Sequence, residues 1–225
     1  PPSPLVVHVA KGSRIAVPPS RSGRSSDPPQ SPRRPSPAVT LYVEGPRDRS
    51  ILRAWAYRLM PGRARPLFGA SVILGGRQPE RALEHFREHS AAAPGASALC
   101  VLDRDGGDDD VPDTNGYDLD FFTWSRRHIE SYLLVPDAIR RALALPVGDY
   151  RIERALEEHL PASGRPEWQR LDAKRLLGAN GPLARAFGAP LPLTKIAQAT
   201  RESELDGDVH ELFARLNERF DAPLR

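Results

Sequence analysis

The chain has 225 residues, enough for one mid-sized domain or for one domain with an appendage. Apolar residues make up 40% of it, which suffices for a core, and its single cysteine excludes an internal disulfide framework and suits a reducing compartment. No apolar run approaches the roughly 20 residues that span a bilayer, so we expect a cytoplasmic protein that makes no membrane contact.

Basic charge is concentrated at the N-terminus. Residues 1–40 hold six basic residues and one aspartate, a net charge of +5, whereas the whole chain has +3 and the remainder therefore −2. Proline, serine and arginine dominate Pro18 to Pro37, so we predict a disordered arm over residues 1–37, with a short hairpin at 5–17. Such an arm could attract nucleic-acid phosphates, although a solvated linker is the plainer interpretation.

Strands and helices alternate after the arm. Short, mostly apolar runs predict four strands, at residues 38–43, 71–74, 97–102 and 117–123. Apolar residues at helical spacing predict helices at 47–59, 79–89, 137–145, 150–159, 167–177 and 208–220. This order is typical of βαβ units, so we expect an α/β domain over residues 38–145, with a small, mainly parallel sheet flanked by helices. Residues 146–225 are predicted to form a helical extension.

Acidic residues follow two of the predicted strands. Glu44 comes directly after the first strand and Asp48 four residues later, while Asp103 and Asp105 come directly after the third. If these parallel strands are neighbours, the four carboxylates crowd one edge of the sheet, where they repel one another unless a cation or protons neutralise them. Oxygen ligands suit Mg²⁺ or Mn²⁺, as one or two ions, rather than zinc. Acidic residues are also common in turns, so the spacing by itself favours a metal site and a structural role about equally.

Three segments resemble motifs of a known nuclease family. Tyr42–Asp48 resembles the first TOPRIM motif, in which a glutamate ends a strand and Gly-x-x-Asp follows, and Val101–Gly106 resembles the Asp-x-Asp motif of the same superfamily. Trp124–Leu134 is similar to the Ile-Glu-x-Tyr-Leu segment of the overcoming-lysogenization-defect (OLD) branch. Together these motifs cover about residues 38–145. The resemblance implies a TOPRIM fold and metal-dependent DNA cleavage, by a domain that usually lies behind an ABC-type ATPase.

The resemblance also implies a role for particular residues. It assigns metal ligation to Glu44, which is also a candidate general base, and to Asp48, Asp103, Asp105 and Glu130. OLD nucleases carry a late lysine that stabilises transition-state charge, and the best candidate here is Lys195.

Arg126 and Arg127 lie beside the expected site and are candidates for contacts with nucleic-acid phosphates, although a surface position would explain them equally well. The sequence has no Gly-x-x-x-x-Gly-Lys-[Ser/Thr], so an ATPase would be a separate domain or chain.

A DNA endonuclease module is therefore the leading hypothesis. One alternative is a non-catalytic TOPRIM-like module that binds nucleic acid or an ATPase partner, which the near-neutral domain favours. Another is an α/β enzyme that acts on small phosphoesters through a similar acidic crevice. The extension could bind DNA, form a homodimer or only buttress the sheet.

Overall fold

The computed structural model describes residues 39–93, 95–104, 111–160 and 165–222. The predicted arm, its hairpin and Asp105 lie outside these ranges. The described residues lie in a single unit, and residues on both sides of the predicted boundary at residue 145 contribute to one core. No helix among the described residues is both long and apolar enough to cross a bilayer.

A four-stranded parallel sheet forms the centre of the fold. Its strands are β1 (Val39–Val43), β2 (Val72–Ile73), β3 (Ser97–Leu102) and β4 (Leu119–Thr123). They lie in the order β2-β1-β3-β4, and every pair is parallel. The predicted parallel α/β sheet is confirmed, and so is the expectation that the first and third strands are neighbours. Their carboxyl ends therefore meet at one edge.

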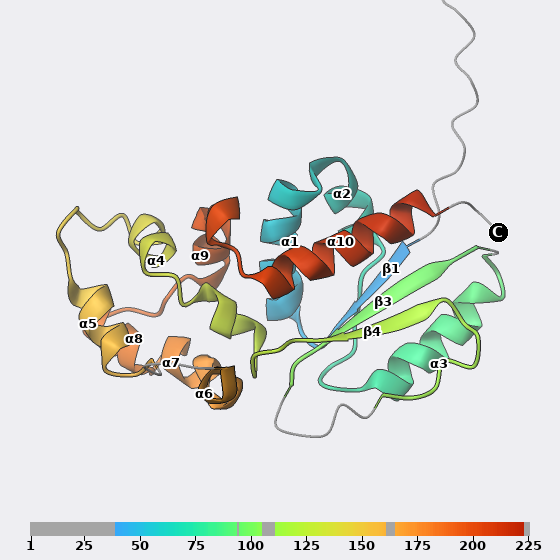
Figure 1. Ribbon diagram of the computed structural model, residues 1–225, viewed down its shortest axis with the longest axis horizontal. Helices are drawn as coiled ribbons and strands as arrows, with labels where there is room; N and C mark the ends of the chain where they lie inside the picture. Colours follow the sequence, from blue (N-terminus) through green and yellow to red (C-terminus); the bar gives the residue numbers. More distant parts are fainter. Residues whose placement is uncertain (1–38, 94, 105–110, 161–164, 223–225) are drawn as a thin grey trace, which may run out of the picture. The chain divides into compact units, whose positions relative to one another are not determined.

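Helices cover both faces of this sheet (Figure 1). The helices involved are α1 (Pro46–Leu59), α2 (Pro61–Gly69), α3 (Pro79–Ser90) and α10 (Gly207–Asp221). Alternate side chains of a strand point to opposite faces: Leu41 belongs to a core with α1, α2 and α10, whereas Tyr42 belongs to a second core with α3. Burial on both faces explains why the two central strands, β1 and β3, are nearly continuous apolar runs.

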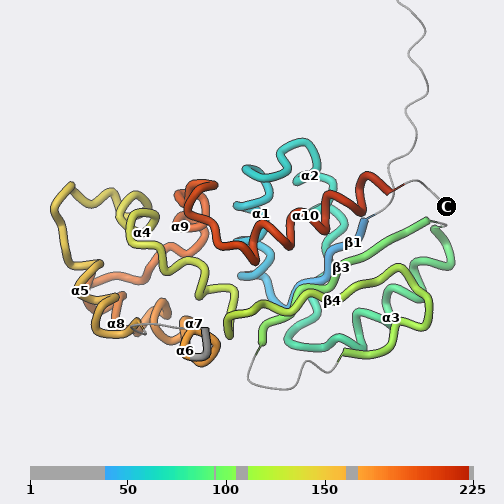
Figure 2. Tube along the Cα trace, viewed as in Figure 1, coloured from blue at the N-terminus to red at the C-terminus, as the bar shows by residue number. Residues whose placement is uncertain are grey.

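The remaining helices gather beyond the carboxyl ends of the strands, and α10 then returns to the sheet (Figure 2). They are the 3₁₀ turns η1 (Ile129–Leu133) and η2 (Glu202–Glu204), and the helices α4 (Pro136–Ala142), α5 (Arg151–Glu157), α6 (Arg165–Arg170), α7 (Ala173–Leu177), α8 (Pro182–Phe187) and α9 (Leu193–Ala199). The helix predicted at 167–177 is in fact two helices, because the Asp172 side chain accepts a hydrogen bond from the amide of Arg175 and caps a new helix there. The sequence did not predict α2, α8 or α9, which have at most nine residues and so show little periodicity.

Candidate metal centre

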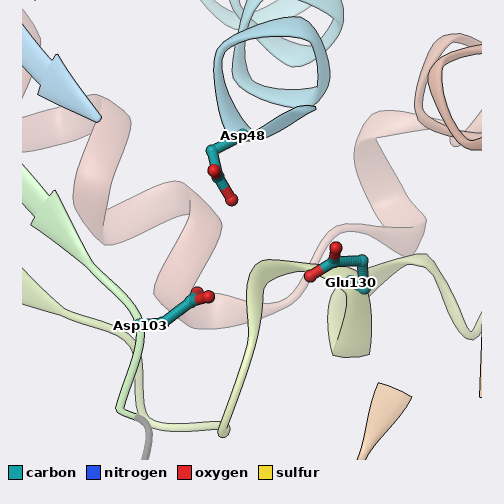
Figure 3. Close-up of side chains that lie close together, drawn as sticks. All are labelled: Asp48, Asp103 and Glu130. Carbon is teal, nitrogen blue, oxygen red and sulfur yellow. The ribbon is translucent and has the colours of Figure 1, made fainter. Parts of the chain in front are cut away.

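Three carboxylates from separate segments converge at the carboxyl edge of the sheet (Figure 3). Asp48 lies in the first turn of α1, Asp103 follows β3 directly, and Glu130 belongs to η1. Each offers one oxygen, and these oxygens all lie within 4.8 Å of one another. Asp103 and Glu130 are buried and Asp48 is half-buried. We call this group the carboxylate cluster.

Backbone hydrogen bonds place Asp103 and Glu130 side by side. β1 and β3 pair in register with Val43 opposite Val101, so Glu44 and Asp103 leave the sheet close together. The amide of Ile129 donates to Asp103 Oδ1 at 3.0 Å, which anchors the start of η1 on the end of β3. Glu130 is the next residue, and its position therefore depends on that bond.

A glycine lets α1 approach the cluster. Gly45 precedes the first residue of α1, and a Cβ atom at this position would lie 2.9 Å from Asp48 Oδ2. A side chain there would displace the Asp48 carboxylate. The Glu-Gly-x-x-Asp pattern thus has a steric reason in this fold.

The charges of the cluster are only partly compensated. Burial, together with the nearby negative charges of Asp103 and Glu130, raises the pKa of Asp48 to about 6. Lys174 Nζ lies 2.6 Å from Asp103 Oδ2, and Arg47 reaches Glu130 Oε1 at 3.2 Å. Glu130 Oε2 is buried and has no hydrogen-bond partner among the described residues. Such an oxygen is costly to bury and is suited to an additional cation.

Glu44 is buried beside the cluster but is not one of the three residues whose oxygens converge. Its Oε1 accepts a hydrogen bond of 2.8 Å from the amide of Asp103. This contact holds the backbone that carries Asp103, so Glu44 positions a member of the cluster. Whether Glu44 also binds metal or acts as a base stays a prediction, and Asp105, outside the described residues, remains a predicted ligand as well.

The lysine at this site is Lys174 of α7, and the sequence analysis missed it. Lys195, the residue predicted for this role, is exposed on α9 and makes no hydrogen bond or ion pair with any residue that the structure describes. The chain has only three lysines, and the sequence analysis named Lys195 alone for this role. No motif surrounds Lys174, and only the packing of α7 against η1 brings it to the site.

The guanidinium of Arg126 is largely engaged by contacts within the protein. It donates to Asp206 Oδ2 at 2.7 Å and to the carbonyl of Ser131 at 2.9 Å, and its guanidinium lies 4.4 Å from the ring centre of Trp168. The predicted phosphate contact would compete with these bonds, so the structure gives Arg126 a role in holding η1 and α10 together. Arg127 is partly exposed, and its phosphate contact stays a prediction.

The donor set of the carboxylate cluster fits a hard divalent cation. Its three groups are all carboxylates and offer neither sulfur nor imidazole, as expected for Mg²⁺ or Mn²⁺ and unlike structural zinc sites. The fold and the cluster together define a parallel α/β protein with an acidic site at the strand ends that could hold a metal ion.

No family model matches the chain, and no curated protein matches it. Among solved structures, the chain is similar to the C-terminal region of the Xanthomonas campestris pv. campestris OLD protein, in structures phased with iodine and with platinum. The TM-scores are 0.43 and 0.41, with 15% and 16% sequence identity, and the matches cover 82% of this chain and 96% and 94% of those chains.

Proposed function

We propose that the carboxylate cluster binds Mg²⁺ or Mn²⁺ and that the chain hydrolyses phosphodiester bonds in DNA, as a nuclease module of the OLD type. The observation that carries this proposal is the convergence of Asp48, Asp103 and Glu130 from three segments to within 4.8 Å. Folding such like charges together raises the free energy of the metal-free protein, and a bound cation offsets that cost. The TOPRIM-like motifs around these residues support the same interpretation.

Each nearby residue would have a separate task. Asp48, Asp103 and Glu130 would hold the ion, which when bound supplies Lewis acidity and a water of lowered pKa. Glu44 keeps Asp103 in place by accepting a hydrogen bond from the backbone amide of Asp103. Lys174, whose side chain is 40% exposed, balances the charge of Asp103 and can donate to a phosphate oxygen that arrives from solvent. DNA as the substrate, an ABC-type ATPase partner, a homodimer and a cytoplasmic location remain predictions from the sequence.

Plasmid nicking tests the proposal. The purified chain would be assayed in Mg²⁺, in Mn²⁺ and in EDTA, beside Asp103→Asn and the control Glu157→Gln, which changes an exposed carboxylate on α5. We expect cleavage with either metal, none in EDTA, a loss of at least about a hundredfold in Asp103→Asn, and no change in the control. Equal cleavage by Asp103→Asn and wild type would refute the site.

The outcome also separates the alternatives. A wild-type chain that binds Mn²⁺ by calorimetry but never cuts DNA would favour the non-catalytic module. Turnover of small phosphoesters without DNA cleavage would favour the phosphate-metabolising enzyme.

A further inference from the structure

A second charged site lies between α1 and α2. It is a cavity of about 220 Å³, lined by Arg49, Arg53, Tyr57, Arg65, Phe68 and Gly69, which we call the arginine pocket. Three of its six lining residues are cationic and none is acidic. None of the three arginines makes an ion pair with any residue that the structure describes, whereas Arg63 on α2 pairs with Asp221. The pocket therefore holds uncompensated positive charge on a concave surface.

Arg49 is fixed in this pocket by neutral groups. Its Nε donates to Ser71 Oγ at 2.7 Å, and one terminal nitrogen donates to the carbonyl of Phe68 at 2.6 Å. A guanidinium has five N–H donors, so these two bonds orient the group and leave donors for a ligand. Because the two acceptors are uncharged, the positive charge of this half-buried side chain stays available to an anion.

The other side chains extend the pocket toward solvent. The guanidinium of Arg53 lies 5.6 Å from the ring centre of Tyr57, a side chain that is 48% exposed. Arg65 is exposed on α2. Arginine forks match the paired oxygens of a phosphate, and an exposed aromatic ring beside them can pack on a sugar or a base.

We propose that the arginine pocket is a phosphate-binding subsite for the backbone of a nucleic acid, separate from the carboxylate cluster. Arg49 follows Asp48 in sequence but points about 100° further around α1. Arg53 lies about 7.5 Å from Asp48 along the axis of the same helix. The pocket therefore contacts phosphates that flank the bond held at the cluster. The choice of nucleic acid as the ligand rests on the proposed function, whereas the affinity of the pocket for phosphate rests on its own residues.

Binding of labelled oligonucleotides in EDTA tests the subsite without cleavage. Anisotropy titrations of the full chain at several salt concentrations would compare wild type with Arg53→Gln/Arg65→Gln. The matched control is Arg154→Gln/Arg170→Gln, which removes two exposed charges from α5 and α6 that are unpaired among the described residues. We expect the pocket variant to bind roughly tenfold more weakly and to lose about 1.4 from the salt slope for single strands, because each lost phosphate contact removes about 0.7. The control should stay near wild type.

Three outcomes would overturn the subsite. Equal weakening in both double variants would mean that only net charge matters. Unchanged affinity in the pocket variant would exclude the contact. Binding of inorganic phosphate or a nucleoside triphosphate through the pocket, with no effect on oligonucleotides, would make it a site for small anions instead.

Failure of the subsite and failure of the nuclease give different results. If the wild-type chain never cuts DNA, but Arg53→Gln/Arg65→Gln binds oligonucleotides more weakly than wild type, the nuclease is refuted and the subsite is kept. If the wild-type chain cuts DNA in the presence of metal, and the variant binds oligonucleotides as tightly as wild type, the nuclease is supported and the subsite is refuted.

Discussion

The two sides of η1 differ in how their charges are balanced. On one side Glu130 faces Asp48 and Asp103, where like charges meet and one carboxylate oxygen lacks a hydrogen-bond partner among the described residues. On the other side, two residues further on, the Tyr132 hydroxyl donates to Asp208 at the start of α10. Burial alone would raise the pKa of Asp208, but hydrogen bonds from Ser125 and Tyr132 bring it below its ordinary value.

This difference separates a site from a scaffold. The carboxylate of Asp208 is stabilised in its charged form, and it stabilises the fold by joining α10 to η1. The carboxylate of Asp48 is destabilised in its charged form, so it costs stability unless a cation is bound. Substitutions on the first side should therefore change activity, and substitutions on the second side should change stability.

The largest expected effect is on catalysis at Glu130. Glu130→Gln should reduce metal-dependent DNA cleavage about a thousandfold, because it removes a ligand charge, while Tyr132→Phe should reduce it by less than about threefold. Initial rates of plasmid nicking, with circular dichroism to verify folding, measure this. Similar losses in both variants would show that η1 acts only as a scaffold.

The next largest effect separates the two lysines. Lys174→Met should slow cleavage by about a hundredfold, since Lys174 contacts Asp103 and can reach a phosphate oxygen. Lys195→Met, the matched control on α9, should remain within twofold of wild type. The same nicking assay decides between them, and the reverse ranking would support the role predicted for Lys195.

On the scaffold side, Tyr132→Phe should lower the free energy of unfolding by about 2 kcal/mol, because it removes a partly buried hydrogen bond to a charged acceptor. For a chain of this size that corresponds to a fall in Tm of roughly 6 °C. Tyr57→Phe is the control, since the Tyr57 side chain is exposed and its hydroxyl accepts only a long hydrogen bond, of 3.4 Å from Arg53, among the described residues. Thermal unfolding of both variants gives the comparison, and equal shifts would contradict it.

The smallest effect is pH-dependent and has the opposite sign. The pKa of Asp48 in the folded chain is about 6, above its ordinary value of 3.8, so the folded state gains stability as pH falls through 6 toward 4. In EDTA at pH 7.5, Asp48→Asn should therefore stabilise the protein, by on the order of 1 kcal/mol once solvent screening is allowed for. Near pH 4 the gain should vanish. Unfolding curves across this range test the sign, and destabilisation at pH 7.5 would be inconsistent with a strained carboxylate.

Local sequence determined most of the sheet and part of the site. Val39–Val43 and Ser97–Leu102 form buried strands because they are mostly apolar, and the acids directly after them had to leave the sheet at its carboxyl edge. Gly45 and Asp48 lie close together because α1 begins directly after the end of β1. These features depend on neighbours in the chain, so periodicity and spacing are enough to find them.

Tertiary structure alone decided which charges meet. Asp103 is 71 residues from Lys174, and Tyr132 is 76 residues from Asp208, so no local pattern records either contact. The packing of the short helices α7 and α9 places Lys174 against Asp103 and leaves Lys195 exposed. The sequence determined the sheet and the carboxylates at its edge, since these follow from burial along single strands. The lysine, the role of Glu44 and the arginine pocket follow from long-range packing, which only the folded chain specifies.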